Sequence, residues 1–227
     1  MLGACHLDDR ESFRLSPICI EGDEIAAGAW ECSDPLVLDC NDGSVPAEIF
    51  VRLDEGACDG LDLQGLDGPF GPGHYDIVIV DGNTDDAVCT TELTVTDALA
   101  PFVETAELSL WPPNHSYYEV GLNDCIASVV DCDDDWTAAI EFVSSDEPVN
   151  DHGDGNTGAD IVLLTSDTVN LRSERQGGGN GRVYTIGFAV TDHSGNSTHA
   201  QCRVVVDHDN GHGQSINDGD AYRVDAA

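Results

Sequence analysis

Two stretches of the sequence decide the expected fold: IVIVDGNTDDAVCTTELTVTD, residues 77–97, and FAVTDHSGNSTHAQCRVVVDH, residues 188–208. Each begins with an apolar run, turns at a segment that starts with Asp and contains Gly-Asn, and ends in a second run that carries one cysteine. Glycine and asparagine accept the positive φ angles of tight turns, so each stretch predicts a β-hairpin. The same hairpin in both halves of a 227-residue chain indicates an internal repeat.

The repeat extends upstream of the hairpins. CSDPLVLDCNDGSVPAEIFVRLDE, residues 32–55, parallels CIASVVDCDDDWTAAIEFVSSDE, residues 125–147. Both contain two cysteines around a short apolar run, then an acidic turn, a strand-like run and a final Asp-Glu. Because the blocks follow in the same order in both halves, we predict two copies of one β-domain. We expect an N-terminal extension over 1–17, a first domain over 18–97, a second domain over 98–210 and a C-terminal tail over 211–227.

The second copy consists of short strand-like runs separated by turn residues. Seven such runs in about 110 residues, without an amphipathic helix, are typical of an immunoglobulin-like sandwich. We therefore predict an all-β protein with two tandem immunoglobulin-like antiparallel β-sandwich domains. The tail is expected either to be loose or to dock as an extra strand. The expected strands are SYYEVGL (116–122), IASVV (126–130), AAIEFVSS (138–145), DIVLLTS (160–166), TVNLRSE (168–174), VYTIGFAVT (183–191) and AQCRVVVD (200–207).

The chain is strongly acidic. It has 44 Asp and Glu residues against 8 basic residues, all of them Arg, and a net charge of −36. Nucleic acids and anionic membranes bind basic surfaces, so this charge argues against both as partners. No apolar run has the length of a membrane span, and we expect no membrane insertion. Such a surface repels itself and needs counter-charge, either from divalent cations or from a salty medium.

Nine cysteines in a chain of this kind indicate an oxidising compartment outside the cytoplasm. The repeat matches three cysteines of the first copy with three of the second, and in each triplet the late cysteine is expected to pair with one of the two early ones. Cys19 and Cys58 have no counterparts, which leaves them to pair with each other. One cysteine of each triplet and Cys5 then remain for bonds between chains or as free thiols. The matched triplets are Cys32, Cys40 and Cys89, and Cys125, Cys132 and Cys202.

The stretch EPVNDHGDGNTGAD, residues 147–160, combines carboxylates, two asparagines and three glycines. A phosphate cradle is excluded by the surplus of carboxylates and by the lack of a Gly-Lys-Ser/Thr sequence. Ca²⁺ takes six to eight oxygen ligands, and glycines allow the backbone to turn its carbonyls inward. We predict a calcium loop, with a solvated acidic loop as the alternative. The candidate ligands are Asp146, Glu147, Asn150, Asp151, Asp154, Asn156 and Asp160.

Two further acidic segments leave alternatives open. Residues 81–92 match the EF-hand ligand pattern at its first, third, fifth and twelfth places, but Asp86 stands where the sharp-turn glycine belongs. The repeat makes this segment a hairpin turn, so a plain turn is preferred over a weak cation site. In DCDDD, residues 131–135, the adjacent carboxylates either bind a cation or repel each other in water.

The sequence offers little for catalysis. The eight histidines form no zinc-binding spacing, and no G-x-S-x-G nucleophile motif is present. Two small sandwiches also leave little room for a substrate cleft. We predict that the protein is not an enzyme. Among the rare cations, Arg172 and Arg175 are expected to neutralise carboxylates such as Glu174, and His115 to cap the turn made by the preceding prolines.

Several motifs resemble a known family. PFVETAELSLWPPNH (101–115), SSDEPVNDHGDGNTGADIV (144–162), the GRVYTIGFAVTDHSGNST segment (181–198) and VVVDHDNGHG (204–213) are similar to bacterial extracellular Ig-like repeat domains related to the hyalin-repeat (HYR) group. SPICIEGDEI (16–25) resembles a hyalin-repeat opening. The chain departs from the family at Gly158, where related sequences often carry a cysteine. The resemblance implies β-sandwich domains with an adhesive or structural role at the bacterial cell surface.

Together these features predict a non-enzymatic, calcium-binding extracellular structural or adhesive protein. The alternative is an accessory module, for example a carbohydrate-binding one, of a secreted hydrolase. The two terminal extensions are long enough to pair with the sheet edge of a neighbouring molecule. We therefore expect self-association, with a head-to-tail homopolymer as its extended form.

Overall fold

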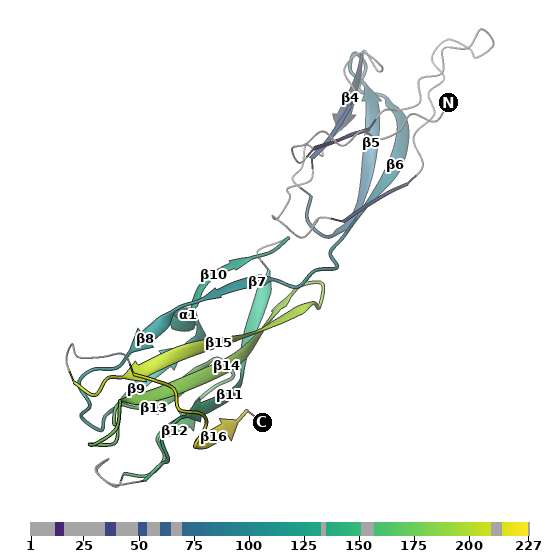
Figure 1. Ribbon diagram of the computed structural model, residues 1–227. Helices are drawn as coiled ribbons and strands as arrows, with labels where there is room; N and C mark the ends of the chain where they lie inside the picture. Colours follow the sequence, from purple (N-terminus) through teal and green to yellow (C-terminus); the bar gives the residue numbers. More distant parts are fainter. Residues whose placement is uncertain are drawn as a thin grey trace. The chain divides into compact units, whose positions relative to one another are not determined.

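The computed structural model describes residues 12–15, 35–39, 50–53, 60–64, 70–132, 135–150, 157–209 and 215–226 (Figure 1). Its described elements are β-strands apart from one short helix, which confirms the predicted all-β class. The chain divides into two compact units. The first unit contains Met1–Leu99 and Asp131–Asp134, and the second contains Ala100–Val130 and Asp135–Ala227.

The first unit is built on a four-stranded sheet with the strand order β2-β6-β5-β4. Its centre is an antiparallel hairpin of β5 and β6, which includes the stretch 77–97 that predicts one. Ile77, Ile79 and Leu93 are almost fully buried, because alternate residues of the hairpin face the core. A separate parallel pair joins β1 to β3. The strands are β1 (Ser12–Leu15), β2 (Leu36–Asp39), β3 (Phe50–Leu53), β4 (Leu61–Gln64), β5 (Gly73–Asp81) and β6 (Ala87–Thr96).

The turn of this hairpin satisfies its own polar groups. Asp81 Oδ1 accepts hydrogen bonds from the backbone N–H of Asn83 at 2.8 Å and from its side-chain amide at 3.2 Å. These bonds favour the ionised carboxyl and hold the pKa of Asp81 below its usual value. Asp85 adopts the left-handed conformation, with φ of 60°. This segment forms the hairpin turn that the repeat predicts.

The second unit contains a five-stranded sheet with the order β16-β11-β14-β15-β8. The long β14–β15 hairpin at its centre includes the predicted hairpin 188–208. A three-stranded sheet, β12-β13-β9, and a β7–β10 pair accompany it. The elements are β7 (Phe102–Thr105), β8 (Glu107–Ser109), β9 (Tyr117–Gly121), α1 (Leu122–Cys125), β10 (Ile126–Val130), β11 (Trp136–Ser145), β12 (Ile161–Leu163), β13 (Thr168–Arg172), β14 (Arg182–Asp192), β15 (Ser197–Val206) and β16 (Tyr222–Asp225).

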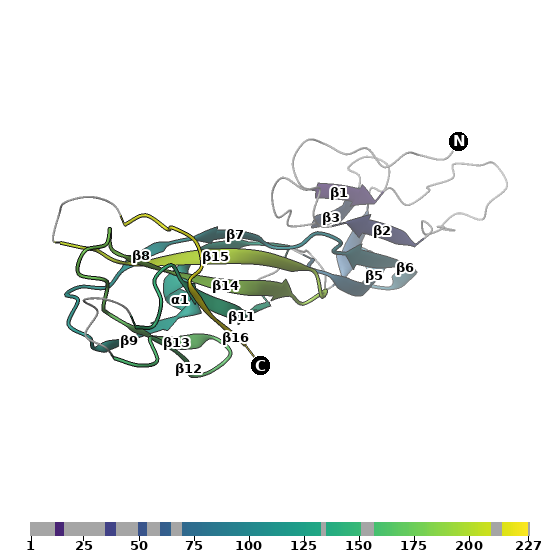
Figure 2. The same ribbon diagram turned by 60° about the horizontal axis from the view of Figure 1, so that its bottom comes forward.

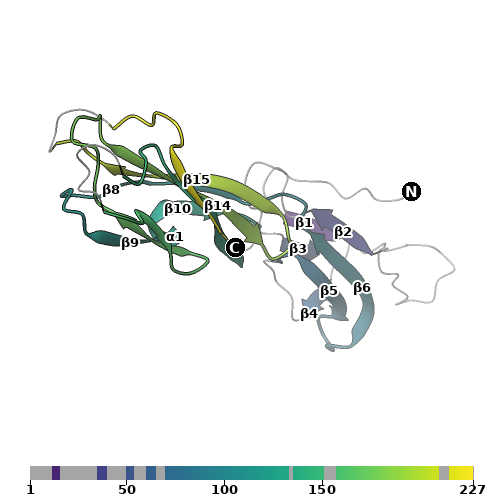
Figure 3. The same cartoon turned by 90° about the horizontal axis from the view of Figure 1, so that it is seen from below.

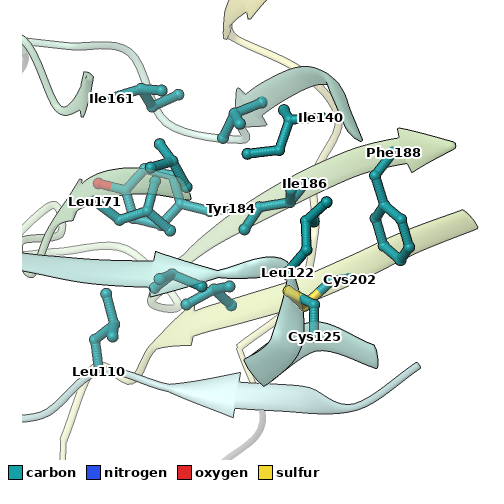
Figure 4. Close-up of a cluster of buried hydrophobic side chains, with 14 of the residues drawn as sticks. Leu110, Leu122, Cys125, Ile140, Ile161, Leu171, Tyr184, Ile186, Phe188 and Cys202 are labelled. Atoms are coloured by element: carbon teal, nitrogen blue, oxygen red, sulfur yellow. A yellow bond between two sulfur atoms is a disulfide. The ribbon is translucent and has the colours of Figure 1, made fainter. Parts of the chain in front are cut away.

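The core of the second unit lies between its two main sheets. In Figure 3, β9 lies on one side of this unit and β14 and β15 on the other. Tyr184, Ile186 and Phe188 point into the core from alternate positions of β14 (Figure 4), and Ile161 and Leu171 meet them from the three-stranded sheet. Side chains from two sheets that interdigitate in this way make a β-sandwich.

A disulfide bond joins Cys125, at the end of α1, to Cys202 on β15 (Figure 4). Both residues are fully buried. Cys125 is one of the two partners that the repeat leaves open for Cys202. Cys89 and Cys132 are also in disulfide bonds, so the expectation that one cysteine of the second triplet is left over is wrong. The expected roles of Cys5, Cys19, Cys32, Cys40 and Cys58 fall outside the described residues.

Three elements of the second unit have no counterpart among the predicted strands: β7, β8 and α1. The helix α1 has a single turn, which is too short to show a helical period. Its first turn is held by the Asp124 carboxylate, which accepts a hydrogen bond from the Gly121 N–H at 3.0 Å. β16 shows that the tail takes the second of its two expected forms, a docked strand.

Candidate functional site

The predicted calcium loop joins β11 to β12. Asp151, Asp154 and Asn156 lie outside the described residues. The other four candidate ligands stand at the two ends of the loop, where the strands of both sheets position them. Their contacts therefore show how the two ends of the loop are attached to the sheets. The four are Asp146, Glu147, Asn150 and Asp160.

Two of these carboxylates bind an arginine. Arg182, at the start of β14, is fully buried. Its Nε donates to Glu147 Oε2 at 3.1 Å, and its Nη1 donates to Asp160 Oδ2. The guanidinium therefore ties both ends of the loop to the central strand of the sheet. A cation at the same oxygens would face this positive charge directly.

Further charged groups complete this arrangement. Glu174 is fully buried, and its Oε2 lies 3.0 Å from His115 Nδ1 and accepts a hydrogen bond from Thr157 Oγ1. Arg172 Nε lies 3.6 Å from Asp160 Oδ1 and 3.9 Å from Glu174 Oε2. We call Glu147, Asp160, Glu174, Arg172 and Arg182 the Arg182 cluster.

The Arg182 cluster holds one more negative than positive charge when all its groups are ionised. Asp160 Oδ1 and Glu174 Oε1 are buried and accept no hydrogen bond among the described residues. Burial, opposed by Arg182 and aided by the neighbouring Glu174 carboxyl, raises the pKa of Asp160 to about 6. The cluster therefore fixes the two ends of the loop to the sheet through Arg182.

The remaining two candidates also contact protein groups. Asp146 Oδ1 accepts a hydrogen bond from the Val183 N–H at 2.8 Å, and burial raises the pKa of Asp146 to about 6. The amide of Asn150 faces the carbonyls of Val149 and Thr157, where it donates rather than accepts. The calcium assignment of this loop stays a prediction. Because the four described candidates contact other protein groups, the assignment now depends on Asp151, Asp154 and Asn156.

Sequence reasoning missed Arg182, although a signal for it exists. Arg182 is in phase with Tyr184, Ile186 and Phe188, the residues of β14 that face the core. An arginine at a core-facing position needs buried carboxylates, because an unpaired buried charge is very costly. The alternation of β14 thus predicts a buried ion pair, without naming its partners.

The other cations divide between carboxylates and carbonyls. Arg172 approaches Glu174 and Asp160, as expected. Arg175 donates from Nε and Nη2 to the His208 carbonyl, at 3.0 and 2.6 Å, and its expected neutralising role stays a prediction. His115 presents its ring to Glu174.

A second acidic arrangement lies in the first unit. Asp131, the first residue of DCDDD, is only 8% exposed, and Asp97 is partly buried. One carboxylate oxygen of each lies within 4.8 Å of the other. Asp97 Oδ1 also accepts a hydrogen bond from the Leu99 N–H at 3.2 Å. The sequence suggested Asp131 but not Asp97, because no local pattern brings together residues so far apart in the chain.

No model of a known protein family matches the chain, and no curated protein matches it in sequence. The hyalin-repeat resemblance therefore stays a prediction from motifs. No helix among the described residues is long and apolar enough to cross a membrane.

The chain has a distant structural similarity to cadherin-like ectodomains, which are β-sandwich proteins. The EC1-2 structure of human mucin-like protocadherin is 12% identical, with 87% of this chain and 95% of that chain covered and a TM-score of 0.30. Human protocadherin-24 EC1-2 is 13% identical, with coverages of 75% and 92% and a TM-score of 0.26. The human desmocollin-1 ectodomain is 20% identical, with coverages of 58% and 22% and a TM-score of 0.24.

Proposed function

We propose that the protein is a non-enzymatic extracellular structural or adhesive protein of the bacterial surface whose first unit binds Ca²⁺. The observation that carries the calcium proposal is the approach of the Asp97 and Asp131 carboxylates, with Asp131 almost completely buried. The extracellular assignment is supported by the disulfide between Cys125 and Cys202.

Two carboxylates this close repel each other. Within 4.8 Å and at an effective dielectric constant of about 20, the repulsion amounts to about 3 kcal/mol or more. A cation bound by both carboxylates would relieve it. Ca²⁺ accepts carboxylate oxygens in flexible geometry, and the chain's charge of −36 attracts divalent cations to its surface. We therefore assign Asp97 and Asp131 to a calcium shell that further oxygens complete.

Thermal unfolding tests this proposal. We expect the melting temperature to be higher in millimolar Ca²⁺ than in EGTA at the same ionic strength, since a ligand at a hundredfold excess over its Kd stabilises by about 2.7 kcal/mol. Asp131→Asn should lose most of this increase. Asp85→Asn is the matched control, because it removes one carboxylate from an exposed turn of the same unit and Asn tolerates the positive φ there.

Three results would contradict the proposal. They are an unchanged melting temperature, an equal increase with NaCl of matched ionic strength, and a full calcium response in Asp131→Asn. Asp154→Asn separates the two candidate sites. If this variant alone loses the response, calcium binds in the loop 147–160 predicted from the sequence.

A further inference from the structure

Residues 215–226, which we call the strap, run along the outer face of the five-stranded sheet and end as its edge strand β16. The strap crosses the sheet over β15 and β14 and ends as β16 beside β11 (Figure 2). β14 is consequently buried along nearly its whole length on both faces: Val183 is fully covered although it points away from the core. The strap thus takes the place of a third layer in this unit.

Polar contacts hold the strap to three strands of the sheet, β11, β15 and β14, the last through Asn217 Nδ2, which donates to Thr185 Oγ1 at 3.4 Å. Ser144 Oγ on β11 donates to Asp220 Oδ1 at 2.7 Å. Arg203 Nη2 on β15 donates to the Ser215 carbonyl at 2.7 Å. The Ala221 N–H donates to the Ser145 carbonyl at 2.9 Å, and antiparallel pairing of β16 with β11 continues from there.

Apolar contacts add to this attachment. Tyr222 and Val224 of β16 pack against the core of the unit. The Arg223 guanidinium lies over the Phe142 ring, 3.7 Å from its centroid. The Phe142 ring in turn lies on Gly187, where any side chain would overlap it. Phe142 and Gly187 therefore form the part of the sheet surface on which Arg223 of β16 lies.

This surface does not depend on the strap for its formation. β11, β14 and β15 are held by their own pairing and by the sandwich core, and the disulfide from Cys202 fixes β15 to α1. When the strap leaves, the edge of β11 loses its partner at Phe142–Ser145. A free sheet edge binds a strand, and the strand that fits this edge is the strap sequence.

We propose that the strap is exchanged between copies of this chain, so that residues 215–226 of one molecule occupy the sheet face of a second. The contacts are the same in both arrangements, because the same residues make them. The balance is set by concentration: attachment within one chain has an effective concentration in the millimolar range, so exchange requires dense packing of the molecules. At a net charge of −36, it also requires salt or divalent cations to screen repulsion between copies.

Cross-linking between two variants of the full chain, each with one added cysteine, tests exchange. Ser144→Cys and Asp220→Cys place thiols on either side of the 2.7 Å contact. The double variant should form an internal disulfide under mild oxidation, because the Ser144 side chain is buried against Asp220. After the two single variants are mixed at high concentration and high salt, we expect a covalent dimer in denaturing gels, in an amount that grows with concentration. A synthetic peptide of residues 215–226 should suppress it.

The control replaces Ser144→Cys by Ser128→Cys, whose hydroxyl contacts Glu104 on the β7–β10 pair. Mixed with Asp220→Cys, this variant should give only the background shown by each variant alone, which also accounts for native thiols. Exchange is refuted if the Ser144→Cys mixture gives no dimer above this background while the double variant links internally. It is also refuted if the peptide has no effect on the dimer. Calcium is absent from all samples, so the result is independent of the proposed calcium site.

Discussion

At the scale of single residues, the chain places one of its few cations in the core. Arg182 is fully buried and contacts Glu147 and Asp160, which lie at opposite ends of an acidic loop. A buried ion pair contributes little net stability compared with apolar packing, but its loss leaves uncompensated charges in a low-dielectric interior. The loop and the sheet are therefore coupled through this one side chain.

Replacing the guanidinium tests this coupling. We expect Arg182→Met to lower the free energy of unfolding by about 3–5 kcal/mol, because it strands two or more buried carboxylates. Glu107→Gln serves as the control, since it breaks an ion pair with Arg203 in which the side chains are 55% and 39% exposed. That change should cost less than about 1 kcal/mol in denaturant titrations. Equal effects of the two substitutions would contradict a special role for Arg182.

A second prediction at this scale concerns pH. The pKa of Asp146 is raised by burial to about 6 from an ordinary value of 3.8, so the folded chain holds a proton there that the unfolded chain has released. The stability that this proton contributes is present below pH 3.8 and is lost as the pH rises through about 6. Between pH 4 and pH 7, the free energy of unfolding of Asp146→Asn should rise by about 1–2 kcal/mol relative to that of the wild type. This energy allows for partial solvent screening of the carboxyl group.

The control is Asp167, a carboxyl group whose contribution to stability has the opposite pH dependence. Hydrogen bonds from Thr165 and Thr168 lower the pKa of the exposed Asp167. Its stabilising contribution is present at neutral pH and is lost as the pH falls through the lowered value. Asp167→Asn should therefore lose stability relative to the wild type as the pH rises. The measurement is the free energy of unfolding of the three proteins against pH, in EGTA. If both variants showed the same pH dependence as the wild type, the assigned pKa shifts of Asp146 and Asp167 would be contradicted.

At the scale of elements, β14 is the strand on which the second unit depends. It pairs with β11 and β15, supplies core residues from one face and carries the strap on the other. Gly187 lies at the register shift between β14 and β11, where the Phe142 ring covers its backbone. A glycine in a central strand is ordinarily unfavourable, and here the close approach of an aromatic ring explains it.

This explanation predicts the effect of a single methyl group. Gly187→Ala should destabilise the second unit by about 1–3 kcal/mol, because the new Cβ overlaps the Phe142 ring. Gly178→Ala adds the same atom where nothing lies within 4 Å, and should change stability by less than about 0.5 kcal/mol. Adding Phe142→Leu should recover part of the loss in Gly187→Ala. Without such recovery in denaturant titrations, the ring contact would not be the cause.

At the scale of the whole molecule, charge dominates. A net charge of −36 destabilises every compact state of the chain through self-repulsion, and added salt relieves that repulsion without any specific site. The calcium proposal is distinguishable from this general effect because it depends on Asp131 and not on exposed carboxylates such as Asp85. The comparison at matched ionic strength therefore separates a specific cation site from screening of the total charge.

The sequence by itself determined both hairpins of this protein and most strands of its second unit. Alternation of apolar residues in 183–191 and the Gly-Asn turns near residues 82 and 195 are local signals, and the structure places β14 and both hairpins where those signals predict them. The repeat likewise limited Cys202 to two early partners, of which the structure selects Cys125. The strands and hairpins are fixed by neighbouring residues, so they can be derived without knowing how the sheets are assembled, whereas the choice of Cys125 needed the assembled sheets.

Only the tertiary structure decided which charges meet. Arg182 binds Glu147 and Asp160 across 35 and 22 residues of chain, and Asp97 approaches Asp131 although neither is near the other in sequence. Strand order places these groups, and the period-two pattern of a strand contains no information about which strand lies beside it. For that reason Glu147 and Asp160, which look like calcium ligands in the sequence, bind a buried arginine in the structure.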